Sequence, residues 1–191
     1  MAAMTVSDWS GIVQGVGSIV AVIAAVGIYG QQYNDKKAEE REEIKAFVQA
    51  VRDEIRSLWS LYDRQVGPAL RGLKDGEAFR YFYPVSADAL TFYNNAASHV
   101  GKVNDAELRR LIVETYAIAK GIISSFQMNN HLLTDYENLL THYQQADRGT
   151  VLESREVGLV QYTIELKRQG DVLDGSVAAL LSKIDGWLER N

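Results

Sequence analysis

The side chains in this sequence that could act as an acid, a base or a metal ligand near neutral pH are its three histidines, His99, His131 and His142. His131 and His142 lie eleven residues apart in a segment with helical periodicity. On a helix they would share one face but stand roughly 16 Å apart along it, at about 1.5 Å per residue, which is too far to hold one metal ion together. His131 and Asp135 have the i, i+4 spacing of either an edge-on metal site or a surface ion pair, and the ion pair is the commoner arrangement.

Recognised catalytic patterns are missing from the sequence. It contains no H-E-x-x-H zinc motif, no G-x-x-x-x-G-K-[ST] phosphate loop and no G-x-S-x-G nucleophile elbow. The R-x-x-x-x-H spacing of helical ribonucleases also fails, because Asn94, Phe126 and Glu137 occupy the arginine positions. We therefore expect no enzyme, no metal site and no cofactor.

An aromatic run at residues 79–84 (F-R-Y-F-Y-P) is the strongest candidate binding element outside the N-terminal region. It lies in the least regular part of the chain, residues 67–86, which contains both prolines. Exposed aromatic patches usually mark interaction sites, so the run is a candidate surface for docking a protein partner. The alternative is a loop that folds over one end of a helical bundle and fills its core. The candidate docking residues are Phe79, Tyr81, Phe82 and Tyr83.

The N-terminal region contains a long uncharged segment. From Trp9 to Tyr29, 21 residues pass without Asp, Glu, Lys or Arg. As a helix this segment would be about 31 Å long, which matches the roughly 30 Å hydrocarbon core of a bilayer. We expect residues 9–30 to form a transmembrane helix in contact with the lipid bilayer.

The two faces of this segment differ in composition. At 100° per residue, one face collects branched apolar residues and the other collects small and polar ones. Helix–helix contact explains this segregation, because small residues let backbones approach and polar side chains hydrogen-bond between helices. We expect a homo-oligomer that packs through this face or lines a pore with it; the alternative is that small residues are merely common in membrane helices. The face consists of Ser10, Gly11, Gln14, Gly15, Gly17, Ser18, Ala21 and Ala25.

Charges beside the segment predict its orientation. Lys36, Lys37 and Arg41 follow it, whereas no Lys or Arg precedes it. Under the positive-inside rule, residues 1–8 are extracytoplasmic and residues 31–191 are cytoplasmic, as in a single-pass protein of the cell inner membrane. The net charge is −5 and no basic block exceeds a pair, which argues against direct nucleic-acid binding.

Helical periodicity continues beyond the uncharged segment. No proline or glycine interrupts residues 31–66, and apolar residues recur there at alternating spacings of four and three, as in a coiled coil. The whole pattern predicts an all-α protein, in which the transmembrane helix is followed by a cytoplasmic antiparallel bundle of three long helices and one short helix. The stripe on residues 31–66 is Ile44, Val48, Val51, Ile55, Leu58 and Tyr62.

Capping residues predict where the later helices begin. Ser86 is the expected N-cap of a short helix that ends near Gly101, and Asn104, with Glu107 in a capping box, is expected to begin the next one. A turn around residues 147–150 should precede the last helix. The expected core face of that helix is Val160, Ile164, Val177, Leu180, Leu181, Ile184, Trp187 and Leu188.

The layout of the whole chain resembles that of small single-pass bacterial membrane proteins of defence or toxin operons. In such proteins a cytosolic helical module controls a membrane helix. The resemblance is architectural and involves no motif. It implies an interaction protein, restrained by a partner through its helical domain, whose spans assemble and perturb the membrane as an antiviral effector. The alternative is a passive membrane-anchored scaffold or adaptor without pore activity.

Overall fold

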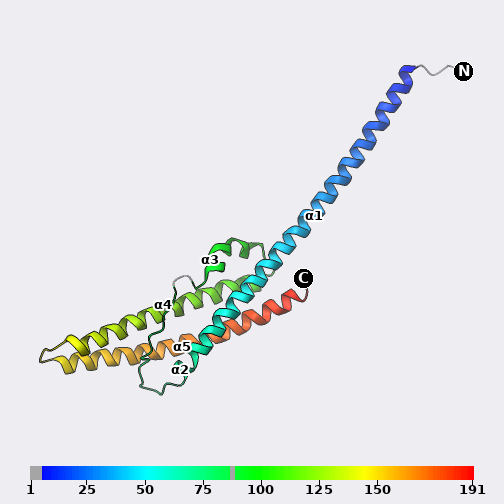
Figure 1. Cartoon of the computed structure of the whole chain (residues 1–191). Coiled ribbons are helices and arrows are strands. Elements are labelled where there is room, and N and C mark those ends of the chain that lie inside the picture. Colours follow the sequence, from blue (N-terminus) through cyan, green and yellow to red (C-terminus); the bar gives the residue numbers. More distant parts are fainter. Residues whose placement is uncertain (1–5, 87–88) are drawn as a thin grey trace. The chain divides into compact units, whose positions relative to one another are not determined.

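The computed structural model describes residues 6–86 and 89–191, with side chains described from residue 31 onward in those ranges. All regular elements in these ranges are helices, which confirms the predicted all-α fold class. Contacts divide the chain into residues 1–44 and residues 45–191, and we call the second unit the bundle. The elements are α1 (Val6–Gln65), α2 (Gly67–Arg71), α3 (Thr91–Ala96), the 3₁₀ helix η1 (Ala97–Lys102), α4 (Ala106–His142) and α5 (Arg148–Leu188) (Figure 1).

Helix α1 contributes the predicted apolar stripe to the core of the bundle. Val48, Val51 and Ile55 are buried, as is Tyr62 farther along, which confirms most of the stripe. Leu58 is half-buried. The helix ends at Gln65, close to the predicted boundary, because the following Gly-Pro pair begins the separate helix α2.

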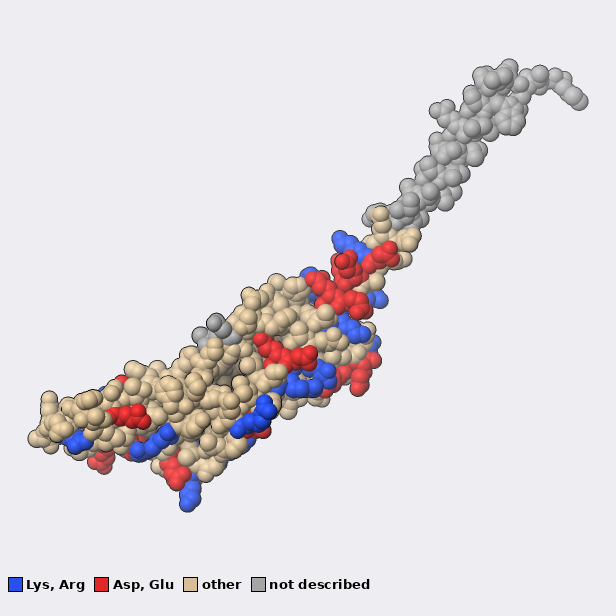
Figure 2. All heavy atoms as spheres, viewed as in Figure 1, with Lys and Arg blue, Asp and Glu red and all other residues tan. Residues whose placement is uncertain are grey.

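Residues 31–43, which precede the bundle on α1, have exposed side chains throughout. Acidic and basic residues alternate closely in this stretch, and Figure 2 shows red and blue side chains crowded together there. A helix that is polar on every side has no apolar face to bury. The exposure of this stretch is therefore explained by its composition.

The expected transmembrane segment, residues 9–30, lies outside the residues whose side chains are described. Helix α1 includes its backbone. Across the part of the chain with described side chains, no helix is both long enough and apolar enough to cross a bilayer.

Helices α4 and α5 form an antiparallel pair and lie side by side (Figure 1). The loop between them is residues 143–147, so the predicted turn at residues 147–150 is wrong by about one helical turn. The Tyr143 hydroxyl donates to Asp147 Oδ1 at 2.9 Å, and the Arg148 guanidinium donates to the Leu140 carbonyl oxygen. These bonds close the loop early and let α5 begin at Arg148.

The core face of α4 follows most of the apolar spacing in its sequence, with three differences. Leu140 belongs to this spacing but is 40% exposed, and Asn129 falls outside it but is buried. Tyr116 also falls outside it, yet it is fully buried and its hydroxyl donates to Glu54 Oε2 on α1 at 2.7 Å. A phenol can be buried in this position because the hydroxyl donates a hydrogen bond to a carboxylate.

The predicted face of α5 is correct in its second half and wrong in its first. Ile164 is 61% exposed, whereas Thr163 and Gly170 face the core. A Cβ atom on Gly170 would lie 2.9 Å from the Tyr62 hydroxyl oxygen, so a larger residue here would force the Tyr62 side chain to shift. The sequence pattern counted only apolar residues and therefore missed a core face that includes a threonine and a glycine. The buried residues are Leu159, Thr163, Leu166, Gly170, Leu173, Val177, Leu180, Ile184 and Trp187.

The predicted helix from Ser86 to Gly101 is wrong in its start and is divided into an α-helical and a 3₁₀ part. In place of one helix the chain forms α3, whose N-cap is Leu90, followed directly by η1. Leu90 provides no side-chain cap. The carboxylate of Glu54 on α1 instead accepts the backbone N–H groups at the start of α3, so a local capping residue is not needed.

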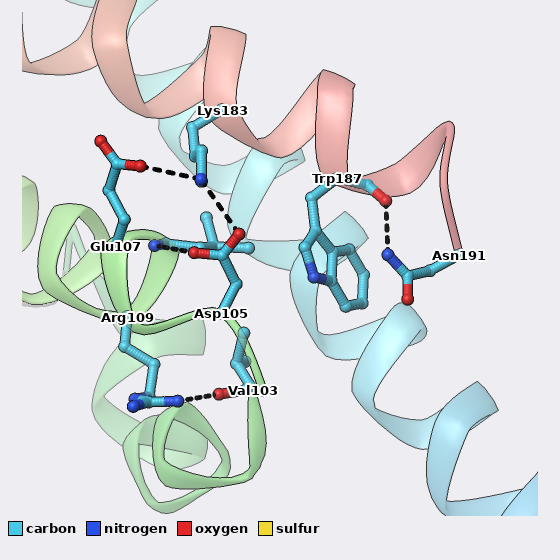
Figure 3. Close-up of polar contacts among 8 residues, drawn as sticks. Val103, Asp105, Glu107, Arg109, Lys183, Trp187 and Asn191 are labelled. Atoms are coloured by element: carbon cyan, nitrogen blue, oxygen red, sulfur yellow. Dashed lines mark hydrogen bonds and ion pairs between the residues drawn. The ribbon is translucent and has the colours of Figure 1, made fainter.

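Helix α4 begins one residue later than predicted, because Asp105 and not Asn104 is its N-cap. The Asp105 carboxylate accepts the Leu108 N–H at 2.9 Å, and the Lys183 ammonium of α5 lies 3.0 Å from its other oxygen (Figure 3). These two interactions, the backbone bond first, lower the pKa of Asp105. Glu107 does not complete a capping box but pairs with Lys183 at 2.9 Å, which joins the start of α4 to the last turns of α5.

The register of α5 can be tested with two substitutions two residues apart. Leu166→Asp places an unpaired charge at a fully buried position and should lower the free energy of unfolding by about 3–5 kcal/mol. Ile164→Asp, at an exposed position, should change it by less than about 0.5 kcal/mol. Thermal unfolding of the full chain in mild detergent, followed by circular dichroism, measures both. Equal losses for the two variants would contradict the register.

Candidate functional site

The aromatic segment, residues 79–84, crosses the α4–α5 pair and begins at a buried ring. Phe79 is 2% exposed, and its backbone N–H donates to Thr163 Oγ1 at 2.7 Å. Its carbonyl oxygen accepts from Asn129 Nδ2 at 3.4 Å. Thr163 belongs to α5 and Asn129 to α4, and both side chains are buried. The start of the segment is therefore bonded to both helices at once.

A second attachment holds the other end of the segment at Tyr83. Its backbone N–H donates to Asn130 Oδ1 at 3.1 Å, and its carbonyl oxygen accepts from Asn130 Nδ2 at 2.6 Å. One side-chain amide thus satisfies both backbone groups of Tyr83, as a neighbouring strand would. The Tyr83 ring meets Phe126 edge-to-face, with ring centroids 5.3 Å apart.

Between these attachments, Arg80 fastens the segment from the solvent side. Its guanidinium lies 2.5 Å from Glu156 Oε2 on α5 and 5.1 Å from the centre of the Tyr136 ring on α4. The bond to Glu156 raises the pKa of Arg80, so the guanidinium keeps its positive charge.

The four candidate docking residues occupy three different environments. Phe79 is part of the core and Tyr83 is half-buried, whereas Tyr81 is 49% and Phe82 57% exposed. The segment therefore both fills the core, through Phe79, and presents two aromatic rings to solvent. Docking of a partner at the exposed pair stays a prediction.

An apolar cavity of about 290 Å³ lies beside Tyr83, between α1, the loop before α3, and α4 and α5. This volume is at the lower end of the range of small-molecule sites. Its lining is almost entirely apolar, so it is suited to an apolar side chain or an aliphatic group and not to a charged one. The lining residues on the helices are Ile55, Leu58, Trp59, Leu61, Tyr62, Ala119, Ile122, Ile123, Phe126, Leu173 and Val177; those on the loop are Tyr83, Pro84, Val85, Ser86, Ala89 and Leu90.

The sequence pattern did not reveal this cavity, because it assigned the lining residues to a filled core. The feature of the sequence that could have indicated the cavity is Ala119, a small side chain among large apolar ones on α4. Burial of its own hydroxyl raises the pKa of Tyr62 to about 12, with nearby Asp174 adding to the shift, so this phenol stays neutral.

The histidines do not form a metal site. His131 Nε2 lies 3.6 Å from Asp135 Oδ2, the ion-pair alternative, and His99 stacks on Phe47 with ring centroids 5.8 Å apart. Among the residues that the structure describes, no group of three or more His, Cys, Asp or Glu side chains is placed to hold a metal ion.

The predicted transmembrane face lies outside the residues with described side chains, so its packing and its possible pore stay predictions. This applies to all eight residues of that face, Ser10, Gly11, Gln14, Gly15, Gly17, Ser18, Ala21 and Ala25.

Comparison of the chain with models of known protein families, with curated proteins and with solved structures finds no match.

Substitutions at Phe79 and Phe82 separate the two roles of the aromatic segment. Phe79→Ala removes a buried ring and should lower the free energy of unfolding by about 3–5 kcal/mol. Phe82→Ala should change it by less than about 0.5 kcal/mol, because most of this ring is already in solvent. Thermal unfolding of the full chain checks both values. A large loss for Phe82→Ala would show that its ring is part of the core.

Proposed function

We propose that this chain is a single-pass membrane interaction protein. In this proposal residues 9–30 cross the lipid bilayer, residues 1–8 lie outside the cytoplasm, and the bundle lies in the cytoplasm. The membrane helices of several copies associate through their small-residue face. The bundle is the part that binds and responds to a protein partner.

The observation that carries this proposal is the order of three contrasting stretches along the chain. An uncharged run of 21 residues is followed by the charged stretch 31–43, whose side chains are all exposed. The part of α1 with buried apolar residues, of which Phe47 is the first along the chain, comes next. A helix that is apolar, then polar all round, then amphipathic matches a bilayer, an aqueous junction and a protein core in turn. Lys36, Lys37 and Arg41 in the junction favour its location on the cytoplasmic side.

The bundle supports the interaction role through its surface. Tyr81 and Phe82 are exposed on a segment whose backbone is held at both ends, so little backbone ordering is needed when a partner binds. Aromatic residues are enriched at protein interfaces, where they contribute much of the binding energy. The apolar cavity lies next to the same segment and is suited to an inserted side chain from a partner.

Two outcomes of span association remain distinct proposals. Gln14 and Ser18 lie on the small face, and polar groups in hydrocarbon are costly unless they find partners or line water. If they line water, the assembly is a membrane-perturbing effector of a bacterial defence or toxin system, restrained by partners of the bundle. If they only bond to one another, the protein is a passive anchored scaffold or adaptor.

Self-association can be measured without background, because the chain contains no cysteine. A single Ser7→Cys should give disulfide-linked dimers in native membranes under mild oxidation. Adding Gly15→Ile and Ala21→Ile should block close approach on the small face and lower the dimer yield about tenfold, equivalent to about 1.4 kcal/mol. The matched pair Val16→Ile and Val20→Leu, on the opposite face, should leave the yield unchanged.

Equal dimer yields for both pairs of substitutions would remove the case for a specific packing face. No dimer in any variant would contradict self-association itself.

Membrane potential separates the effector from the scaffold. Overproduction of the chain without its partner should depolarise cells, as read with a voltage-sensitive dye, and slow their growth. Gln14→Leu should relieve both effects while preserving membrane insertion, because it removes the most polar group of the segment. An unchanged potential on overproduction of the unaltered chain would favour the scaffold.

A further inference from the structure

The segment that joins the aromatic loop to α4, residues 91–102, is attached to the bundle by few buried groups. Helix α3 has no buried residue, and Val100 is the buried residue of η1. The residues at its two ends, Leu90 and Val103, are buried. The segment therefore lies on the surface of the bundle between two anchored ends.

The carboxylate of Glu54 makes a polar attachment at the start of this segment. Glu54 on α1 accepts the backbone N–H of Phe92 at 2.8 Å through one oxygen and that of Tyr93 at 3.1 Å through the other. The carboxylate also accepts a hydrogen bond from the Tyr116 hydroxyl on α4, with 2.7 Å between the two oxygens. Leu90 gives no side-chain cap. Glu54, on a different helix, therefore accepts two of the N–H groups that have no partner within the first turn of α3.

Ring contacts add to the attachment, and one of them is the stacking of His99 on Phe47 described above. The Tyr93 ring is stacked on Tyr116 with centroids 3.8 Å apart and planes at 10°. Phe92 packs on Phe47 of α1 with centroids 5.9 Å apart. Burial, followed by the bond to Glu54, raises the pKa of Tyr116, so the phenol remains a hydrogen-bond donor to the carboxylate.

We propose that residues 91–102 form a clasp that opens from the bundle as a separate unit, and that the carboxylate of Glu54 controls this opening. Few buried side chains are a feature of a local unfolding unit. The rest of the bundle, held by the α1, α4 and α5 core, stays folded when the clasp opens.

Opening the clasp uncovers the rings of Phe47 and Tyr116. Phe47 lies three residues beyond the boundary between residues 1–44 and the bundle, so the uncovered surface is at the start of the bundle on α1. A partner that binds only the open form would shift the population toward it. The clasp concerns the bundle alone and does not depend on the proposed membrane function.

Hydrogen exchange of the full chain in mild detergent, read by mass spectrometry, tests the clasp. In the unaltered chain, amides of residues 91–102 should exchange faster than those of residues 173–187 on α5. Glu54→Ala should accelerate exchange in residues 91–102 about tenfold or more, because it leaves two N–H groups and a phenol without their acceptor. Glu54→Gln, which keeps one acceptor oxygen, and Tyr116→Phe, which keeps the ring stack, should give smaller increases.

The control is Asp53→Asn, at the neighbouring exposed carboxylate of α1, which should leave the exchange of residues 91–102 unchanged. The proposal is overturned if Glu54→Ala has no more effect than this control. It is also overturned if Glu54→Ala accelerates residues 91–102 and residues 173–187 equally, because Glu54 would then support the whole core and no separate clasp would exist.

Discussion

The burial of the α1 stripe between α4 and α5 is the interaction on which the rest of this structure depends. Val48 and Val51 are completely buried, and Tyr62 packs against the backbone of Gly170 on α5 and the ring of Phe126 on α4. Without α1, the α4–α5 pair would expose its own apolar face to water, at a cost of about 25 cal/mol per Å². Because α1 also carries the uncharged segment, the same helix serves both the bundle core and the proposed membrane anchor.

Around this core, isolated polar side chains attach the parts of the bundle that are not long helices. Thr163 and the neighbouring Asn129 and Asn130 hold the aromatic segment by its backbone, and Glu54 holds the start of α3. In each case a side chain on a packed helix satisfies main-chain groups that have no helical or strand partner, which buried backbone requires. These attachments place Tyr81 and Phe82 on a segment whose end, at Tyr83, borders the apolar cavity.

The sequence predicted what depends on local periodicity and missed what depends on contacts between distant residues. The stripe of α1, most of the α4 face and the second half of the α5 face follow from apolar spacing. The first half of α5 does not follow from this spacing. Gly170 faces the core there because the Tyr62 hydroxyl lies against it, and Tyr62 is more than a hundred residues away in the chain. The start of α3 was misplaced for a similar reason, since its cap is a glutamate on another helix. The aromatic segment was predicted from the sequence as a candidate site, but its division into a buried and an exposed part depends on its contacts with α4 and α5.

The central claim is that one segment near the N-terminus crosses a membrane and leaves the bundle in the cytoplasm. The absence of native cysteine allows a direct measurement with a membrane-impermeant maleimide on intact cells of a Gram-negative expression host. A single Ser7→Cys should be labelled in intact cells, whereas a single Ser154→Cys, exposed on α5, should be labelled only after the cells are permeabilised. Labelling of Ser154→Cys in intact cells, or protection of both positions until lysis, would contradict the account.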